Sequence, residues 1–254
     1  MKTFIIILFI SSLINANIAN YDAGVNFFEQ RDKEALGLKA NSNYINQAIN
    51  EFSIASKNAK NELDAGIYLL RCYYFKGKFV AIDDESKKKI FSNGKQLGEK
   101  LIILYPESPA AYYWYLVNLG SWAEVYGILS AAREGVANIM RNYSKKIIEL
   151  DSEYSDGGGY FMLGAVHLKS PYIPFLLTWP SKKKSLEYLS LAYDTGDATP
   201  SQTVYLARSL FSNGKKDKAK SLLNFLLNKK ISKSNKLEDL EQHQIAKELL
   251  LDWK

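Results

Sequence analysis

The chain has 254 residues, 47% of them hydrophobic and 24% charged, with a single cysteine and two histidines. That apolar share excludes a disordered chain, and 15 glycines and 6 prolines are too few for a collagen-like or low-complexity sequence. One cysteine forms neither an intramolecular disulfide nor a thiolate zinc site, and two histidines are a poor basis for metal chemistry. The length permits one large domain or two small ones.

The basic residues are mostly lysines. The formal net charge is +6, and only five of the 33 basic residues are arginines. Because base recognition favours the bidentate guanidinium group, this composition indicates solubility rather than nucleic-acid binding. The lysine runs at residues 87–89 and 182–184 are expected to be solvated helix starts. The lone Cys72 stands in an apolar stretch and is expected to be a buried, inert thiol.

The first 19 residues have the pattern of a cleaved secretory signal peptide. Lys2 is followed by an uncharged apolar run of 11 residues, 4–14, and then by small and polar residues around Ala16 and Ala19. A membrane-spanning helix needs about 20 residues, although an uncleaved N-terminal anchor stays open as the alternative. No cysteine lies near the exit, so the pattern excludes a lipoprotein. We expect residues 20–254 to be soluble and exported, either periplasmic or secreted.

Residues 20–254 are expected to form one all-α domain. They show no sustained period-two alternation, whereas helical periodicity recurs in pieces of about 12 to 20 residues separated by Gly, Asn, Asp or Pro. Before residue 107 the predicted elements are the end of an opening helix pair at Ala48, Phe52 and Ala55, a first helix with its turn at Leu69, Tyr73 and Gly77, and the end of a second helix at residues 101–106.

A predicted helix over residues 109–132 carries aromatic side chains on all its faces. Such a helix is either covered on more than one side or presents aromatic surface to a partner. The small residues Gly120, Ala123 and Gly127 permit close packing, which favours the first interpretation. The aromatic residues are Tyr112, Tyr113, Trp114, Tyr115, Trp122 and Tyr126.

Another helix end is predicted at residues 147–151, followed by three consecutive glycines in residues 155–160. A phosphate-binding loop would require a lysine and a hydroxyl residue at the helix start, where the chain has Tyr160 and Phe161. We therefore expect a turn between helices that needs positive φ.

The next predicted helix pair is interrupted by an inserted loop. Its first helix carries Leu163, Gly164 and His167, and its second carries Ser185, Leu189 and Ala192. Pro171, Pro174 and Pro180 forbid a regular helix across residues 169–180, although that loop is strongly apolar. Such a loop either folds onto the core or contacts another molecule.

The clearest helix pair lies near the C-terminus. Its helices are predicted at residues 201–213, after Pro200, and at residues 218–227, with Gly214 between them. A closing helix is predicted at residues 237–253. The order Leu206-Ala207, Leu210, Gly214, Ala219, Leu223, Leu226 resembles the tetratricopeptide repeat (TPR), in which small residues let two antiparallel helices approach closely. About four to five degenerate units of this kind are expected to stack into an α-solenoid.

Several further segments resemble a particular family. The run at residues 113–124, and the combination of residues 148–151, 156–160, the proline-rich insertion and 186–189, are similar to the periplasmic T component of tripartite ATP-independent periplasmic (TRAP) transporters. The aromatic helix resembles more loosely the regulators of microtubule dynamics. The first resemblance implies a periplasmic scaffold that associates with a solute-binding protein and assembles into a trimer with hydrophobic pores.

The predicted function is that of an exported, non-enzymatic scaffold for a protein partner, which by the resemblance is the solute-binding component of an organic-acid importer. A repeat solenoid presents a concave surface built from successive first helices, on which Tyr68 and Tyr73 are also candidates. The predicted contact residues are Tyr113, Trp114, Tyr115, Trp122, Tyr172, Phe175, Trp179 and Tyr205.

The alternative is direct binding of a hydrophobic small molecule in a pocket lined by the aromatic helix and the apolar loop. Catalysis is not expected, because His167 and His243 lie far apart and no nucleophile or carboxylate pair accompanies a base in a recognisable motif. No cofactor, metal or nucleic acid is expected. His167 falls at a repeat-core position and is expected to be structural.

Overall fold

The structure, a computed structural model, describes residues 19–175 and 177–253. These residues are mainly helical, with two isolated β-bridges and no β-strand among them, which confirms the all-α prediction. The predicted signal peptide, residues 1–19, lies outside the described residues except for Ala19. None of the described helices is both long enough and apolar enough to cross a membrane.

The chain divides into two compact units. The first takes the described residues up to Pro106 together with Val117–Val125, and the second takes Glu107–Leu116 together with the described residues from Tyr126. Helix α5 (Pro109–Tyr126) therefore belongs to the second unit over its first half and to the first unit over most of its second half.

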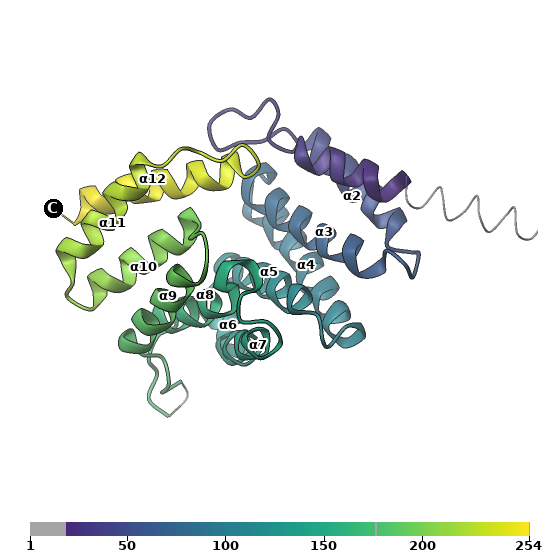
Figure 1. The fold of residues 1–254 in the computed structure, drawn as a ribbon. Coiled ribbons are helices and arrows are strands. Elements are labelled where there is room, and N and C mark those ends of the chain that lie inside the picture. Colours follow the sequence, from purple (N-terminus) through teal and green to yellow (C-terminus); the bar gives the residue numbers. More distant parts are fainter. Residues whose placement is uncertain (1–18, 176, 254) are drawn as a thin grey trace, which may run out of the picture. The chain divides into compact units, whose positions relative to one another are not determined.

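The first unit is built from helices that pack against their neighbours in sequence. After helical residues 19–29 come α2 (Ser42–Ala55), α3 (Glu62–Phe75), the π-helix η1 (Lys76–Val80) and α4 (Asp84–Leu104). Helix α3 contacts both α2 and α4 (Figure 1). The predicted end of the opening pair is confirmed, because Ala48, Phe52 and Ala55 are all fully buried on α2.

The prediction of a turn at Gly77 is wrong. Gly77 lies within the π-helix that continues α3, where the backbone does not reverse. A side chain at this position would overlap the Phe91 ring from α4, so the glycine is required by the close approach of that ring. In the same unit, buried Asn118 of α5 donates from Nδ2 to the Leu70 carbonyl of α3 at 3.0 Å and leaves no room for a side chain at Gly94.

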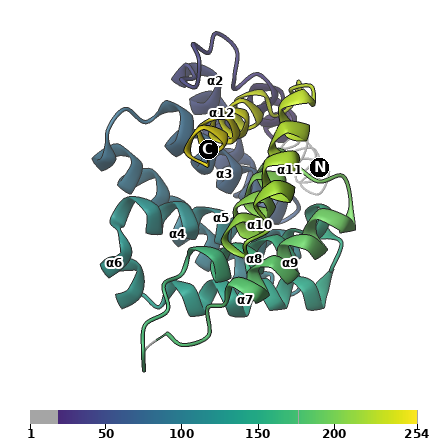
Figure 2. The same ribbon diagram turned by 90° about the vertical axis from the view of Figure 1, so that its left-hand side faces the viewer.

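The second unit is a run of helices in which each one from α7 onward contacts the next. They are α6 (Ile128–Arg133), α7 (Val136–Leu150), α8 (Tyr154–Lys169), α9 (Lys182–Thr195), α10 (Pro200–Ser212), α11 (Lys216–Asn228) and α12 (Lys236–Asp252). Helix α10 also contacts α8 and α12, so the first helices of successive pairs adjoin one another (Figures 1 and 2). This is the stacking of helix pairs that the sequence predicts.

Small side chains stand where these helices come closest, as predicted. A Cβ added at Gly164 of α8 would lie 2.6 Å from Leu189 Cγ and 2.9 Å from the Leu189 backbone nitrogen of α9. Ala207 of α10 and Ala219 of α11 are fully buried. Val204, Ala207, Leu223, Leu226 and Ala246 form one core that joins α10, α11 and α12.

The turns between these helices follow local chemistry. Thr199 and Gln202 form a capping box at the start of α10, with Pro200 in its first turn, and Gly214 ends the following turn with φ of 77°. The glycine-rich segment does contain the predicted positive φ, but at Ser155, Asp156 and Gly157. Gly158 and Gly159 are buried in α8 instead, where neighbouring side chains leave no room for a Cβ.

Candidate interaction surfaces

Two of the predicted contact residues are buried in the core. Tyr115 is 2% exposed and packs edge-on against Tyr143 of α7, with ring centroids 5.9 Å apart. Trp122 is 7% exposed, and the Lys95 ammonium lies 5.5 Å from the centre of its ring. Of the two interpretations of this helix, coverage by neighbouring elements therefore holds for Tyr115 and Trp122, which present no appreciable surface to a partner.

Tyr113 and Trp114 are half-buried and serve the packing of the second unit. Tyr113 packs edge-on against Trp114 and Tyr154, and its ring fills the space beside Gly158. Burial raises the pKa of the Tyr113 hydroxyl, although its hydrogen bond with Ser155 acts in the opposite direction. Tyr113 thus covers the left-handed turn at residues 155–157, near the start of α8.

The inserted loop is anchored at its base by Trp179. The indole Nε1 donates to Asn138 Oδ1 of α7 at 2.9 Å, and the ring packs edge-on against His167 of α8 with centroids 5.0 Å apart. The Arg141 guanidinium lies 4.8 Å from the centre of the Trp179 ring. This end of the loop is folded onto the helices.

The opposite end of the loop is exposed. Ile173 and Leu177 exchange two backbone hydrogen bonds of 2.9 and 2.8 Å, which close a tight turn. Tyr172 and Phe175 are exposed beside and within that turn. Both sequence interpretations of the loop therefore describe part of it: the base packs on the fold and the tip is free to contact another molecule.

His167 is a structural residue at the base of the loop. Its Nδ1 accepts a hydrogen bond from the Ser181 backbone N–H at 3.2 Å. Burial lowers the pKa of His167, the positive charges of Arg141, Lys184 and Lys145 lower it further, and Glu187 opposes them. The folded state therefore favours the neutral imidazole, which is able to accept that hydrogen bond.

We expect stability to fall as the pH drops below the unfolded-state histidine pKa of about 6.5. In this range the unfolded state binds a proton at His167 that the folded state resists, so protonation favours unfolding. His243, whose pKa is also lowered by burial, acts in the same direction. Urea midpoints of the wild-type protein and His167→Gln at pH about 7.5 and about 5.5 test this. An equal loss of stability in both proteins would contradict it.

A partly exposed aromatic and basic surface lies on α8 and α10. The rings of Phe161 and Tyr205 meet edge-on with centroids 5.2 Å apart, and the Lys169 ammonium lies 5.5 Å from the Tyr205 ring centre. Arg208 follows Tyr205 by three positions and so shares its face of the helix. The Arg208 Nε is buried and has no hydrogen-bond partner among the described residues. We name this surface, made of Phe161, Lys169, Tyr205 and Arg208, the first-helix face.

Of the first-helix face, the sequence predicted only Tyr205. Arg208 could have been found from its spacing of three residues after Tyr205 on a predicted first helix. Phe161 and Lys169 belong to the preceding first helix, and their proximity to Tyr205 follows from the contact between α8 and α10. In the first unit, Tyr68 stacks on Phe52 with centroids 4.7 Å apart, and burial raises the pKa of Tyr73.

A separate open groove, with a volume of about 570 Å³, lies along α9, α10 and α11. Its lining is mainly apolar, with Tyr193, Leu210 and Phe225 among its residues and Asp217 and Lys218 at α11. None of the eight predicted contact residues lines it.

Among the described residues, no group of three or more His, Cys, Asp or Glu side chains is placed to hold a metal ion. Cys72 is buried as predicted, and that burial strongly raises its pKa, which keeps the thiol protonated and unreactive.

No protein-family model and no curated protein matches the chain. Among solved structures, it is similar to a thermophilic TPR protein from Thermus thermophilus, with a TM-score of 0.58 and 14% sequence identity. That alignment covers 93% of this chain and 98% of the other. At this identity the similarity shows the fold alone. The chain therefore has a TPR-like helical fold.

Proposed function

We propose that the chain is an exported, non-enzymatic scaffold whose first-helix face binds the solute-binding component of a TRAP-type organic-acid transporter. Support for a scaffold comes from the TPR-like fold. Support for this class of partner comes from the resemblance of residues 113–124, 148–151, 156–160, the proline-rich insertion and 186–189 to the T component. The resemblance further implies a homotrimer, and the signal-peptide pattern implies a periplasmic or secreted location.

The observation that carries the proposal is the chemistry of the first-helix face. Tyrosine and arginine are the residues most often found as anchors of protein interfaces. Arg208, a partly exposed residue, brings a positively charged guanidinium to this face, and such a group forms strong hydrogen bonds with carboxylates. The nearby Lys169 adds a second positive charge. A partner that offers a carboxylate or backbone carbonyl beside an apolar contact fits this face.

Isothermal titration calorimetry with the purified solute-binding protein of the same organism tests the proposal. We expect Arg208→Lys, which keeps the charge but removes the planar guanidinium that pairs with a carboxylate in bidentate geometry, to weaken binding at least about tenfold. Tyr205→Ala is expected to do the same by removing the aromatic anchor. The matched control is Phe225→Ala on α11, outside this face, which should bind as the wild-type protein does. An absence of binding by the wild-type protein would contradict the proposed partner.

The alternative function, binding of a hydrophobic small molecule, is favoured by one different observation. Tyr115 and Trp122 of the aromatic helix are buried, whereas the groove along α9, α10 and α11 is a mainly apolar surface open to solvent, on which an apolar molecule would lie partly exposed. Native mass spectrometry separates the two functions, because a carried ligand appears as added mass without a second protein. Loss of that mass in Phe225→Ala would place the ligand in the groove.

A further inference from the structure

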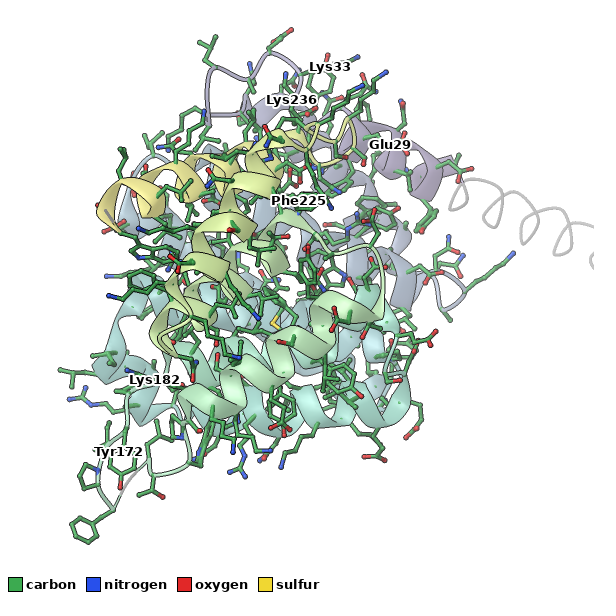
Figure 3. The ribbon with its side chains drawn as sticks, turned by 60° about the vertical axis from the view of Figure 1, so that its left-hand side comes forward. Glu29, Lys33, Tyr172, Lys182, Phe225 and Lys236 are labelled. Carbon is green, nitrogen blue, oxygen red and sulfur yellow. The ribbon has the colours of Figure 1, made fainter. Side chains whose placement is uncertain are left out.

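The tip of the loop between α8 and α9 presents apolar side chains that the second unit leaves uncovered. Phe175 is 104% exposed and Tyr172 is 63% exposed. Figure 3 shows Tyr172 on the loop where it projects away from the helices, with Lys182 near its base and Phe225 well apart from both. Single exposed aromatic residues are ordinary, but two on a projecting tip indicate a contact with another molecule.

The backbone of the tip supports that interpretation. Phe175 has a φ of 63°, a left-handed conformation that glycine or asparagine adopts far more readily than a bulky residue. The hydrogen bonds between Ile173 and Leu177 hold the turn closed in this conformation. The Phe175 side chain gains no burial within the described part of the chain. A phenylalanine at this position therefore does not serve the packing of the described fold.

The base of the loop is fixed before the tip meets a partner. Trp179 fixes the base of the loop through its hydrogen bond to Asn138 and its contacts with His167 and Arg141. Because the base is already ordered, binding through the tip loses less conformational entropy than binding through a flexible loop.

The surroundings of the loop are basic. Residues 136–148 and 163–186 contain no aspartate or glutamate. Lys182 and Lys183 are exposed at the start of α9, and Arg141 contacts Trp179 at the loop base. The full set of cationic residues in the two segments is Arg141, Lys145, Lys146, Lys169, Lys182, Lys183 and Lys184. Two of them face glutamates one turn further on, in the pairs Lys146–Glu149 and Lys184–Glu187.

We propose that this loop docks the protein on a lipid bilayer that contains anionic phospholipid. Phe175 and Tyr172 enter the interfacial region, where aromatic side chains are favoured. Lys182 and Lys183 contact the headgroup phosphates, to which their long side chains can extend. The absence of aspartate and glutamate from residues 136–148 and 163–186 favours an anionic bilayer as the occupant, because its surface attracts clustered lysines and arginines.

A fluorophore at the tip tests the proposal directly. Phe175→Cys is labelled with the polarity-sensitive dye NBD, whose aromatic ring takes the place of the phenyl ring at the tip and leaves Tyr172 unchanged, while the native Cys72 is buried and unreactive. The matched control is Phe225→Cys on α11, which is also exposed at the surface of the second unit. Both labelled full-length chains are mixed with vesicles of phosphatidylcholine, with and without phosphatidylglycerol. The N-terminal apolar run is common to both chains, so the difference between the two positions is the readout.

We expect a blue shift at position 175 with phosphatidylglycerol vesicles, quenching there by brominated lipid, and no comparable change at position 225. No shift at 175, or equal shifts at both positions, would overturn the proposal. A shift that depends on protein concentration without vesicles would identify a second copy of the chain as the occupant and would also overturn it.

Two sets of variants separate the charge contribution from a structural role. With the label at position 175, the double variant Lys182→Glu and Lys183→Glu should partition into vesicles at least about tenfold more weakly. The double variant Lys230→Glu and Lys233→Glu makes an equal charge change in the loop before α12 and should not weaken partitioning. Equal effects of the two pairs would contradict specific docking.

Phe175→Gly should leave Tm unchanged or higher, because glycine adopts the left-handed conformation readily. A clear fall in Tm would show that Phe175 serves the fold and would overturn the proposal.

Discussion

Replacing Phe52 with alanine is expected to lower the free energy of unfolding of the first unit by about 3–5 kcal/mol. Phe52 is fully buried on α2, stacks on Tyr68 and packs edge-on against Tyr21. Truncation removes those contacts and leaves a cavity that close-packed neighbours fill only in part. Urea unfolding followed by circular dichroism measures the change.

The matched control for Phe52→Ala is Phe225→Ala. Phe225 is 51% exposed on α11, so the same chemical change there should alter the free energy of unfolding by less than about 1 kcal/mol. Losses of similar size in the two variants would mean that Phe52 is not in a core, which would contradict the packing of α2 on α3.

Gly164→Val is expected to destabilise the second unit by about 1–3 kcal/mol. In an exposed helix the change would be mildly favourable, because glycine is the poorer helix former. At Gly164, however, a Cβ meets both the side chain and the backbone of Leu189, so α9 would have to move away from α8. The urea midpoint of unfolding measures the loss.

Asn224→Val on α11 is the control for Gly164→Val, because it places the same β-branched side chain at an exposed helix position. We expect it to change the free energy of unfolding by less than about 0.5 kcal/mol. If Gly164→Val unfolds at the same urea concentration as the wild-type protein or a higher one, the close approach of α8 and α9 is contradicted.

The helix pairs could be predicted from the sequence because their signals are local. Ala207, Gly214 and Leu223 mark a helix, a turn and a second helix by spacing alone, and the structure has α10, the turn and α11 in that order. Gly164 could be predicted as a close-approach site in the same way. Periodicity decides such features because the buried face of a helix recurs every three to four residues.

The structural role of Gly77 in the first unit could not be predicted from the sequence. The spacing of Leu69, Tyr73 and Gly77 indicates a helix followed by a turn, but the structure continues into a π-helix in which Gly77 lies against the Phe91 ring of α4. A glycine that permits positive φ and a glycine that permits close approach look the same in a sequence. The neighbouring helix that distinguishes them is known only from the structure.

The candidate surfaces were predictable by residue type more than by position. Aromatic composition indicated α5 and the inserted loop, yet Tyr115 and Trp122 are buried while Phe175 is exposed. The hydrogen bond between Trp179 and Asn138 fixes the loop base and joins residues 41 positions apart. A contact between residues so distant in sequence is not predicted by any local sequence pattern. The unpartnered Nε of Arg208 is likewise visible only once its surroundings are known.

Hydrogen–deuterium exchange on the complex with the solute-binding protein tests the proposed scaffold function most directly. If the first-helix face is the binding surface, backbone amides of α8 and α10 around Phe161 and Tyr205 become protected when the partner is added, while those of α9 and α11 exchange as in the free protein. Protection confined to α9 and α11, or no change in exchange anywhere, would contradict the assignment of that face.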